Sequence, residues 1–239
     1  MENVKTKSVG QIVADDFRTA TVFQKYGIDF CCNGNITIEQ ACDKKHVDVE
    51  QLLENLDVIR DSEDQSTDYQ SWPLDLLADY IEKTHHRYIE EVTPALLQFL
   101  NKLCKVHGQN HPELIEINEE FKASAGELAA HMKKEELMLF PFIRKMVSAK
   151  KMGQHPGSSV FGSVSNPIEA MMQEHDVEGN RFKKITELSN GYTLPQDACN
   201  TYQVAFKTLK EFENDLHKHI HLENNILFPK AIELEKEFS

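Results

Sequence analysis

The chain has 239 residues, of which 40% are hydrophobic and 27% charged, and its formal net charge is -13 at pH 7. This is the composition of a globular protein with enough apolar side chains for a core, and it excludes disordered and fibrous classes. The negative charge would repel nucleic-acid backbones and anionic membrane surfaces, so neither is expected as a partner, whereas metal cations would be attracted. Because no apolar run reaches the length of a signal peptide or a membrane span, we expect a cytoplasmic protein.

Residues 1–60 are predicted to form a small helical domain. From Val9 to Ile59 apolar and polar residues alternate at helical spacing, with turn-like breaks at 27–34 and near 46–49. The next stretch, 61–72, is almost wholly polar and is predicted to be a linker.

Residues 73–239 are predicted to form a second domain, an all-α four-helix bundle. Pro73 suits the first turn of its first helix. No convincing run of alternating β-branched residues occurs beyond this point, and four long amphipathic segments are found instead, at roughly 73–107, 111–148, 165–190 and 195–236. The stretch 148–165 is rich in Gly, Ser and Lys, and is interpreted as a surface connection.

Two of these segments carry nearly the same phrase. HMKKEELMLFP begins at His131 and HIHLENNILFP begins at His219, so corresponding positions lie 88 residues apart (219-131). The preceding segments correspond as well, because His86 lies 45 residues before His131 and His175 lies 44 before His219 (131-86 and 219-175). The bundle is therefore predicted to consist of two duplicated helical hairpins.

The repeat predicts a metal site. On a helix, residues i and i+4 project from one face, so each His-x-x-x-Glu pair presents a nitrogen and a carboxylate together. Inward carboxylates and histidines are how helical bundles hold two iron ions, and the mixture of imidazole and carboxylate favours iron over a structural zinc. We therefore expect two iron ions with an oxo or hydroxo bridge and carboxylate bridges, held by His86, His131, Glu135, His175, His219 and Glu223.

Histidines and glutamates at this spacing also occur without a metal. A single His-x-x-x-Glu pair is usually a solvated or ion-paired couple, but buried charges repeated at matching places need partners. The choice between His85 and His86 stays open from the residues alone. The histidines that flank a predicted ligand are assigned to surface or supporting roles: His85, His217 and His221. Those near turns are expected to face solvent: His46, His107, His111 and His155.

The five cysteines are an odd number in a chain without an export signal, so they are interpreted as reduced thiols. The adjacent pair Cys31 and Cys32 is a candidate for redox chemistry or iron transfer, with Lys25 nearby in sequence to lower a thiol pKa. The single cysteines are expected to be packing residues: Cys42, Cys104 and Cys199.

Taken together, the phrase FCCNG at 30–34, the single His86, the Glu174-His175-Asp176 triplet and the two His-x-x-x-Glu phrases resemble the repair-of-iron-centres family (RIC; the YtfE, ScdA and DnrN proteins) over essentially the whole chain. The resemblance implies a cytoplasmic di-iron protein of hemerythrin-like fold. It also implies that the six predicted ligands correspond to the six ligand positions of the family, in which the two glutamates bridge the iron ions. In the family, the first ligand histidine lies at set distances along the chain from two prolines. The same distances, counted here from Pro73 and Pro94, favour His86 over His85.

The resemblance also covers the cysteine loop and implies a function. Asn33 replaces a glycine that is common in the family, and asparagine tolerates left-handed backbone well enough to keep the turn. The expected function is repair of iron-sulfur clusters damaged by nitrosative or oxidative stress, by iron donation or by reaction with nitric oxide; only the second route would make the protein an enzyme.

The alternative function is a hemerythrin-like oxygen or nitric oxide sensor or binding protein without turnover. Four candidate histidines, rather than the five of hemerythrin-type carriers, argue against oxygen storage. The expected partners are damaged iron-sulfur proteins or their assembly machinery, and the oligomeric state, with a dimer as one option, stays open.

Overall fold

The computed structural model describes residues 7–60 and 67–238. Over these residues the chain is built from helices without any strand, which confirms the all-α class. None of the helices in the described ranges is long and apolar enough to cross a membrane. The first half of the predicted linker, 61–66, lies outside the described residues; the rest contains the short helix η2 (Tyr69–Ser71).

The chain divides into two compact units. One runs from Ala78 to His219, and the other combines the chain up to Leu77 with the segment from Ile220 onward. The boundary at His219 falls inside a helix that continues without interruption to Lys236.

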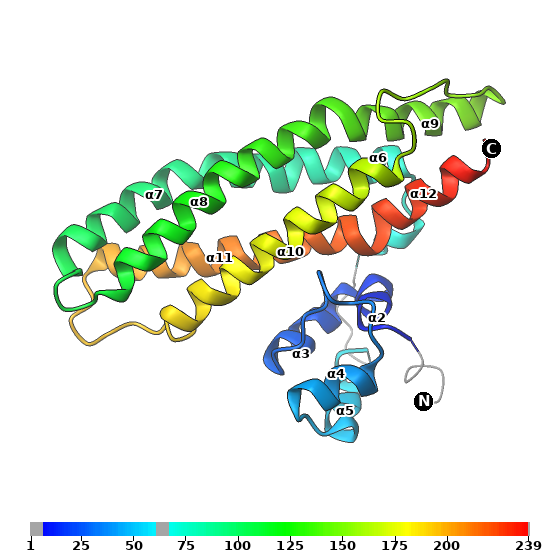
Figure 1. The fold of residues 1–239 in the computed structure, drawn as a ribbon. Coiled ribbons are helices and arrows are strands. Elements are labelled where there is room, and N and C mark those ends of the chain that lie inside the picture. Colours follow the sequence, from blue (N-terminus) through cyan, green and yellow to red (C-terminus); the bar gives the residue numbers. More distant parts are fainter. Residues whose placement is uncertain (1–6, 61–66, 239) are drawn as a thin grey trace. The chain divides into compact units, whose positions relative to one another are not determined.

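The larger unit is a bundle of long helices that lie side by side (Figure 1). Its elements follow one another in an up-and-down order: the end of α6 (Leu74–Tyr80), η3 (Ile81–His86), α7 (Arg87–His107), α8 (Glu113–Lys134), η4 (Glu135–Leu139), α9 (Phe140–Met152), α10 (Ser165–Leu188) and α11 (Asn200–Leu222). Phenylalanines from three helices fill the middle of its core, because Phe121 and Phe182 lie 5.2 and 5.6 Å, centroid to centroid, from Phe212. Burying such rings is a main source of bundle stability.

The repeated phrase contains a widened π turn in both places. The turns are η4 and η5 (Glu223–Leu227), and each precedes a helix with proline in its first turn, α9 and α12 (Phe228–Lys236). Proline has no N–H to donate to the carbonyl four residues earlier, so the α pattern cannot continue through it. The amide of Phe140 donates to the Glu135 carbonyl instead, and that of Phe228 donates to the Glu223 carbonyl. Such turns are frequent at functional sites.

The connection after α9 is shorter than the composition predicts. Helix α9 continues to Met152, so residues 148–152 are helical and the surface connection begins at Gly153. Serine and lysine do not break a helix; Gly153 does so here, with a left-handed φ of 62° that glycine adopts at little cost.

The smaller unit contains the N-terminal helices and the last turns of the C-terminal helix. Its remaining elements are α2 (Val9–Asp15), η1 (Phe17–Thr19), α3 (Ala20–Lys25), α4 (Ile38–Lys45) and α5 (Val49–Arg60). Capping boxes begin α2 at Ser8 and α4 at Thr37. The loop before α4 is held by side-chain amides, because Asn224 donates to the Cys31 carbonyl at 3.2 Å and Asn225 to the Phe30 carbonyl at 3.3 Å.

Candidate metal centre

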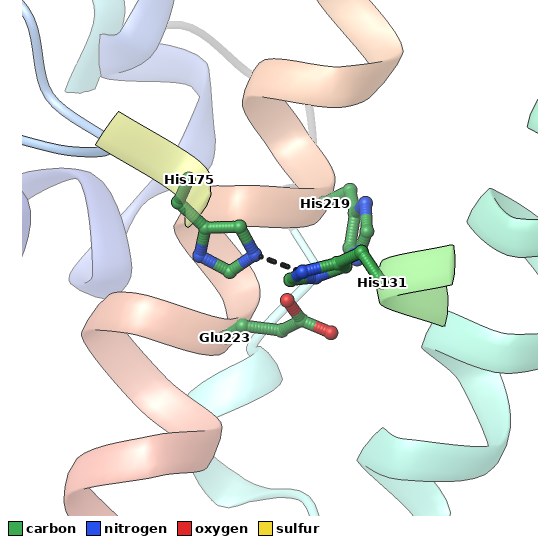
Figure 2. A group of neighbouring side chains, drawn as sticks. All are labelled: His131, His175, His219 and Glu223. Atoms are coloured by element: carbon green, nitrogen blue, oxygen red, sulfur yellow. Dashed lines mark hydrogen bonds between the residues drawn. The ribbon is translucent and has the colours of Figure 1, made fainter. Parts of the chain in front are cut away.

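The six predicted ligands form two overlapping groups of donor atoms. One group is His131, His175, His219 and Glu223, and the other is His86, Glu135, His219 and Glu223; within each group, one nitrogen or oxygen atom per residue lies within 4.8 Å of all the others. All six side chains are buried. Figure 2 shows the first group, with the imidazoles and the Glu223 carboxylate turned toward one another. The groups share His219 and Glu223, so together they form one continuous buried cluster of possible metal ligands.

The spacing of the donor atoms suits metal ligation. The Nε2 atoms of His131 and His175 lie 3.1 Å apart, and one oxygen of Glu135 lies 3.3 Å from His131 Nε2 and 3.4 Å from His86 Nε2. Within the described ranges, neither carboxylate oxygen of Glu135 has a hydrogen-bond partner, although the side chain is fully buried. A buried carboxylate surrounded by ring nitrogens is costly unless a cation or a proton lies between them. The donor set therefore fits a metal site.

The electrostatic environment keeps Glu135 ionised. Burial by itself would raise the pKa of this carboxyl group, but the neighbouring imidazoles of His131 and His86 outweigh burial and hold its pKa well below the usual range. An ionised carboxylate is the form that ligates a cation.

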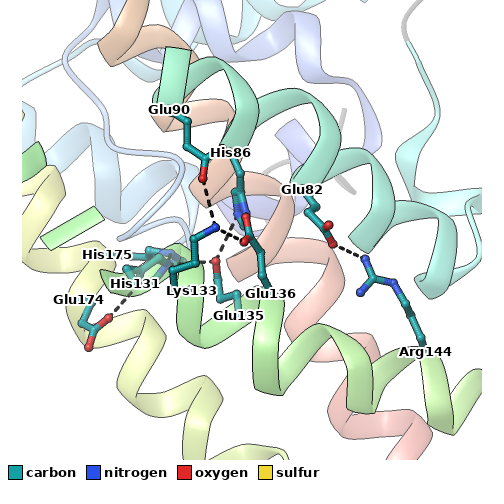
Figure 3. Close-up of polar contacts among 10 residues, drawn as sticks. All are labelled: Glu82, His86, Glu90, His131, Lys133, Glu135, Glu136, Arg144, Glu174 and His175. Carbon is teal, nitrogen blue, oxygen red and sulfur yellow. Dashed lines mark hydrogen bonds and ion pairs between the residues drawn. The ribbon is translucent and has the colours of Figure 1, made fainter. Parts of the chain in front are cut away.

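Two carboxylates outside the cluster orient the ligands (Figure 3). His131 Nδ1 lies 2.8 Å from Glu174 Oε2, and His86 Nδ1 lies 3.1 Å from Glu136 Oε1. With Nδ1–H donating to a carboxylate, the lone pair on Nε2 points into the cluster, which is the arrangement found around metal-ligating histidines.

Lysines in turn hold these carboxylates. Lys133 bridges Glu136 and Glu90, and Lys134 pairs with Glu174. Burial would raise the pKa of Glu174, but Lys134 and His131 lower it more. The orienting roles of Glu136 and Glu174 were not predicted from the sequence, although each adjoins a predicted ligand.

His85 and His86 are both buried, and the structure gives them different neighbours. His86 belongs to the second group, whereas His85 belongs to neither: its Nδ1 contacts Asp215 at 2.9 Å and its ring stacks on His219. His221, the other buried flanking histidine, packs against Phe30 in the smaller unit. Of the surface and supporting roles expected for His85 and His221, the surface role is wrong, because both side chains are buried; the stacking of His85 on His219 agrees with a supporting role.

The vicinal cysteines form a separate small group with Asp29. The two sulfur atoms lie 3.8 Å apart, and Cys31 Sγ lies 3.4 Å from Asp29 Oδ1. The hydrogen bond with Cys32, burial and the charge of Asp29 raise the pKa of Cys31 well above the usual thiol value. Lys25 lies over the Tyr26 ring, and the groups that shift the pKa of Cys31 are Cys32 and Asp29. Asn33 keeps a negative φ, and its side chain donates to Asp29 at 2.7 Å.

Comparison with known proteins agrees with this architecture. The family model of the hemerythrin HHE cation binding domain matches residues 77–231, and the ScdA_N model, a domain of unknown function (DUF542), matches residues 5–59. The chain is 31% identical over 222 residues to the iron-sulfur cluster repair protein ScdA of Staphylococcus haemolyticus, covering 93% of this chain and 96% of that protein.

Two further relatives are the iron-sulfur cluster repair proteins YtfE of Yersinia pestis strain Pestoides F and of Yersinia pseudotuberculosis serotype O:1b. Each is 32% identical over 228 residues, covering 95% of this chain and 97% of the relative. Both domains are thus matched, and the relatives are covered over nearly their whole length. The chain belongs to the ScdA and YtfE family, which joins a DUF542 domain to a hemerythrin HHE cation binding domain.

Proposed function

We propose that this protein repairs damaged iron-sulfur clusters with a di-iron centre in its helical bundle. The observation that carries the proposal is the overlap of the two buried groups at His219 and Glu223, because two cations bound there would share these two ligands. The names of the relatives support the biological role. The proposed clients are iron-sulfur proteins of the cytoplasm.

The proposed ligands are the four histidines His86, His131, His175 and His219 and the two carboxylates Glu135 and Glu223. Glu135 lies between His86 and His131, which belong to different groups, and Glu223 belongs to both groups; this supports the proposal that each would bridge two cations. Iron at this site would supply a redox-active cation that can be exchanged or can bind a small ligand such as nitric oxide. Glu136 and Glu174 hold the histidines so that their Nε2 lone pairs face the site.

The cysteine loop is proposed to assist transfer of iron or electrons. Asp29, Cys31 and Cys32 place two sulfurs and one carboxylate oxygen within 4.8 Å of one another, a donor set that suits a thiophilic cation. Two side-chain amides fix the loop backbone, because Asn224 and Asn225 donate to its carbonyl groups. Asn224 directly follows the proposed ligand Glu223, so the loop is anchored next to a ligand.

The test is restoration of a client. Iron-loaded protein is mixed, without oxygen, with an iron-sulfur enzyme inactivated by nitric oxide, and the enzyme's activity is followed. Wild type is expected to restore it, and Glu223→Ala is expected to fail while Glu119→Ala, on the exposed face of α8, matches wild type. Restoration by an iron-free Glu223→Ala variant at the wild-type rate would refute the proposal.

The same reaction distinguishes the two chemical routes. Nitrous oxide formed while iron stays bound would indicate that the centre reduces nitric oxide, and iron appearing in the client would indicate donation. Glu119→Ala is the matched control for both readouts.

A further inference from the structure

A second reactive cluster lies at the end of the bundle where α7 turns into α8 and where the loop from α10 enters α11 (Figure 1). It contains Cys199, His107, His111 and Asp197. The expectation that Cys199 is a packing residue is wrong, because Cys199 is exposed and immediately precedes the first residue of α11.

Cys199 forms a pair with a histidine from a different helix. Its Sγ lies 3.3 Å from Nε2 of His107, and Nδ1 of His107 lies 4.0 Å from Oδ2 of Asp197. The same aspartate contacts His111 Nε2 at 2.9 Å through its other oxygen. Nucleophile, imidazole and carboxylate thus follow one another in the order that activates thiols in enzymes.

The start of α11 adds to the effect of the histidine. Cys199 is positioned where the first backbone N–H groups of a 23-residue helix are directed, and those of Thr201 and Tyr202 interact favourably with its sulfur. A helix N-terminus stabilises an anion. The hydrogen bond with His107, followed by these backbone groups, lowers the pKa of Cys199 from 9.0 to about 7.

The surrounding charges do not cancel this stabilisation. The ionisable groups around the thiol come from every neighbouring element: His107 and Lys102 on α7, His111 in the turn, Glu113 on α8, Asp197 in the loop and Tyr202 on α11. The carboxylates are engaged with histidines, since Glu113 and Asp197 both contact His111. Both raise the pKa of His111, so that it favours the cationic form.

There is also space beside the cluster. A cavity of about 200 Å³ is lined by His111 and Tyr202 together with the turn residues Leu194 and Pro195. It could receive the organic part of a small reagent. Cys104 provides a contrast on the same helix as His107, because burial raises its pKa and its sulfur donates to the Leu114 carbonyl.

We infer that Cys199 is a nucleophilic thiol that is modified by low-molecular-weight disulfides, with His107 as the group that holds its proton. In this step the Cys199 thiolate attacks one sulfur of the disulfide, and a new S–S bond forms as the old one breaks. The Cys199 sulfur is oxidised and the leaving sulfur is reduced to a thiolate, which takes the proton from His107. The inference does not depend on the metal centre.

The experiment measures mixed-disulfide formation with oxidised glutathione on the full chain. The rate is followed by peptide mass spectrometry at Cys199 and Cys104, over a pH range on both sides of neutrality. For wild type, the Cys199 rate is expected to rise with a midpoint near 7, and Cys104 is expected to react far more slowly. In His107→Gln the midpoint should move toward 9.0.

At pH 7 the His107→Gln rate is expected to fall about five- to tenfold, because the loss of thiolate is partly offset by the greater nucleophilicity of a more basic thiol. His155→Gln, which removes an exposed imidazole far along the chain from this cluster, is the matched control and should change the rate little. A wild-type midpoint near 9.0, or equal rates for Cys199 and Cys104, would overturn the inference. An unchanged rate in a folded His107→Gln variant would do the same.

Discussion

The two hairpins of the bundle carry the same candidate metal ligands at corresponding positions and differ in the residues around them. His131 and Glu135 correspond to His219 and Glu223 at an offset of 88, and all four are buried. The next residue differs: Glu136 orients His86 in the first half, whereas Asn224 in the second half donates to the Cys31 carbonyl. One position thus serves the site in one half and anchors a loop in the other.

The residues beside the single histidines differ in the same manner. Glu174, before His175, contacts His131, while His85, before His86, contacts Asp215 and stacks on His219. The comparison teaches that the ligand pattern follows from helix geometry, which the repeat preserves. The residues that contact the candidate ligands from outside depend on which helix lies opposite, and these contacts differ between the two halves.

The largest effect is expected where the halves agree. Phe140→Ala and Phe228→Ala remove corresponding, fully buried rings that follow the π turns, and each should lower the free energy of unfolding by about 3–5 kcal/mol. Urea denaturation of chelator-treated protein measures the loss. Leu137→Ala, at a 73% exposed side chain, is the control and should cost little. A small loss for only one ring would show that the two halves are packed differently.

The next effect should appear only where the halves differ. Glu136→Gln and Glu174→Gln remove the carboxylates that orient His86 and His131, so iron affinity should fall about 10- to 100-fold. Competition with a chelator measures it. Asn224→Ala, at the position that corresponds to Glu136, should leave the affinity unchanged. Equal losses in all three variants would contradict the asymmetry.

A smaller effect concerns the cysteine loop. Asn224→Ala and Asn225→Ala each remove hydrogen bonds to the loop carbonyls, worth about 0.5–1.5 kcal/mol. Alkylation of Cys31, which is 4% exposed, should therefore become several-fold faster. Asn180→Ala, which removes an exposed amide from α10, is the control. Unchanged alkylation would mean that other contacts hold the loop.

The smallest effect is a difference in pH dependence. Glu178 is buried in the second half, at the position that Ile89 occupies in the first half. Burial raises the pKa of Glu178, and this effect outweighs the lowering by the hydrogen bond that Ser124 donates. Because the folded chain keeps this proton to a higher pH than the unfolded chain does, stability should fall as pH rises from 4.5 through the folded pKa. Glu178→Gln should flatten this fall in thermal denaturation, and Glu187→Gln on the exposed face should not.

Much of the bundle follows from sequence because helical spacing, the 88-residue repeat and the prolines are local signals. They predict the helices, and they select the six residues that the structure brings together. Supporting contacts are not local: Glu174 meets His131 from another helix, and Cys199 meets His107 across 92 positions. The end of α9 was misplaced because serine and lysine resemble a loop in composition while remaining compatible with a helix.

The central claim is tested most directly by the metal content of protein purified without oxygen, compared among wild type, Glu135→Ala and Glu223→Ala. Two irons per wild-type chain are predicted, with the spectrum of a bridged pair, and both variants should lose iron while staying helical by circular dichroism. Wild type without iron, a single zinc, or full iron content in both variants would contradict the account.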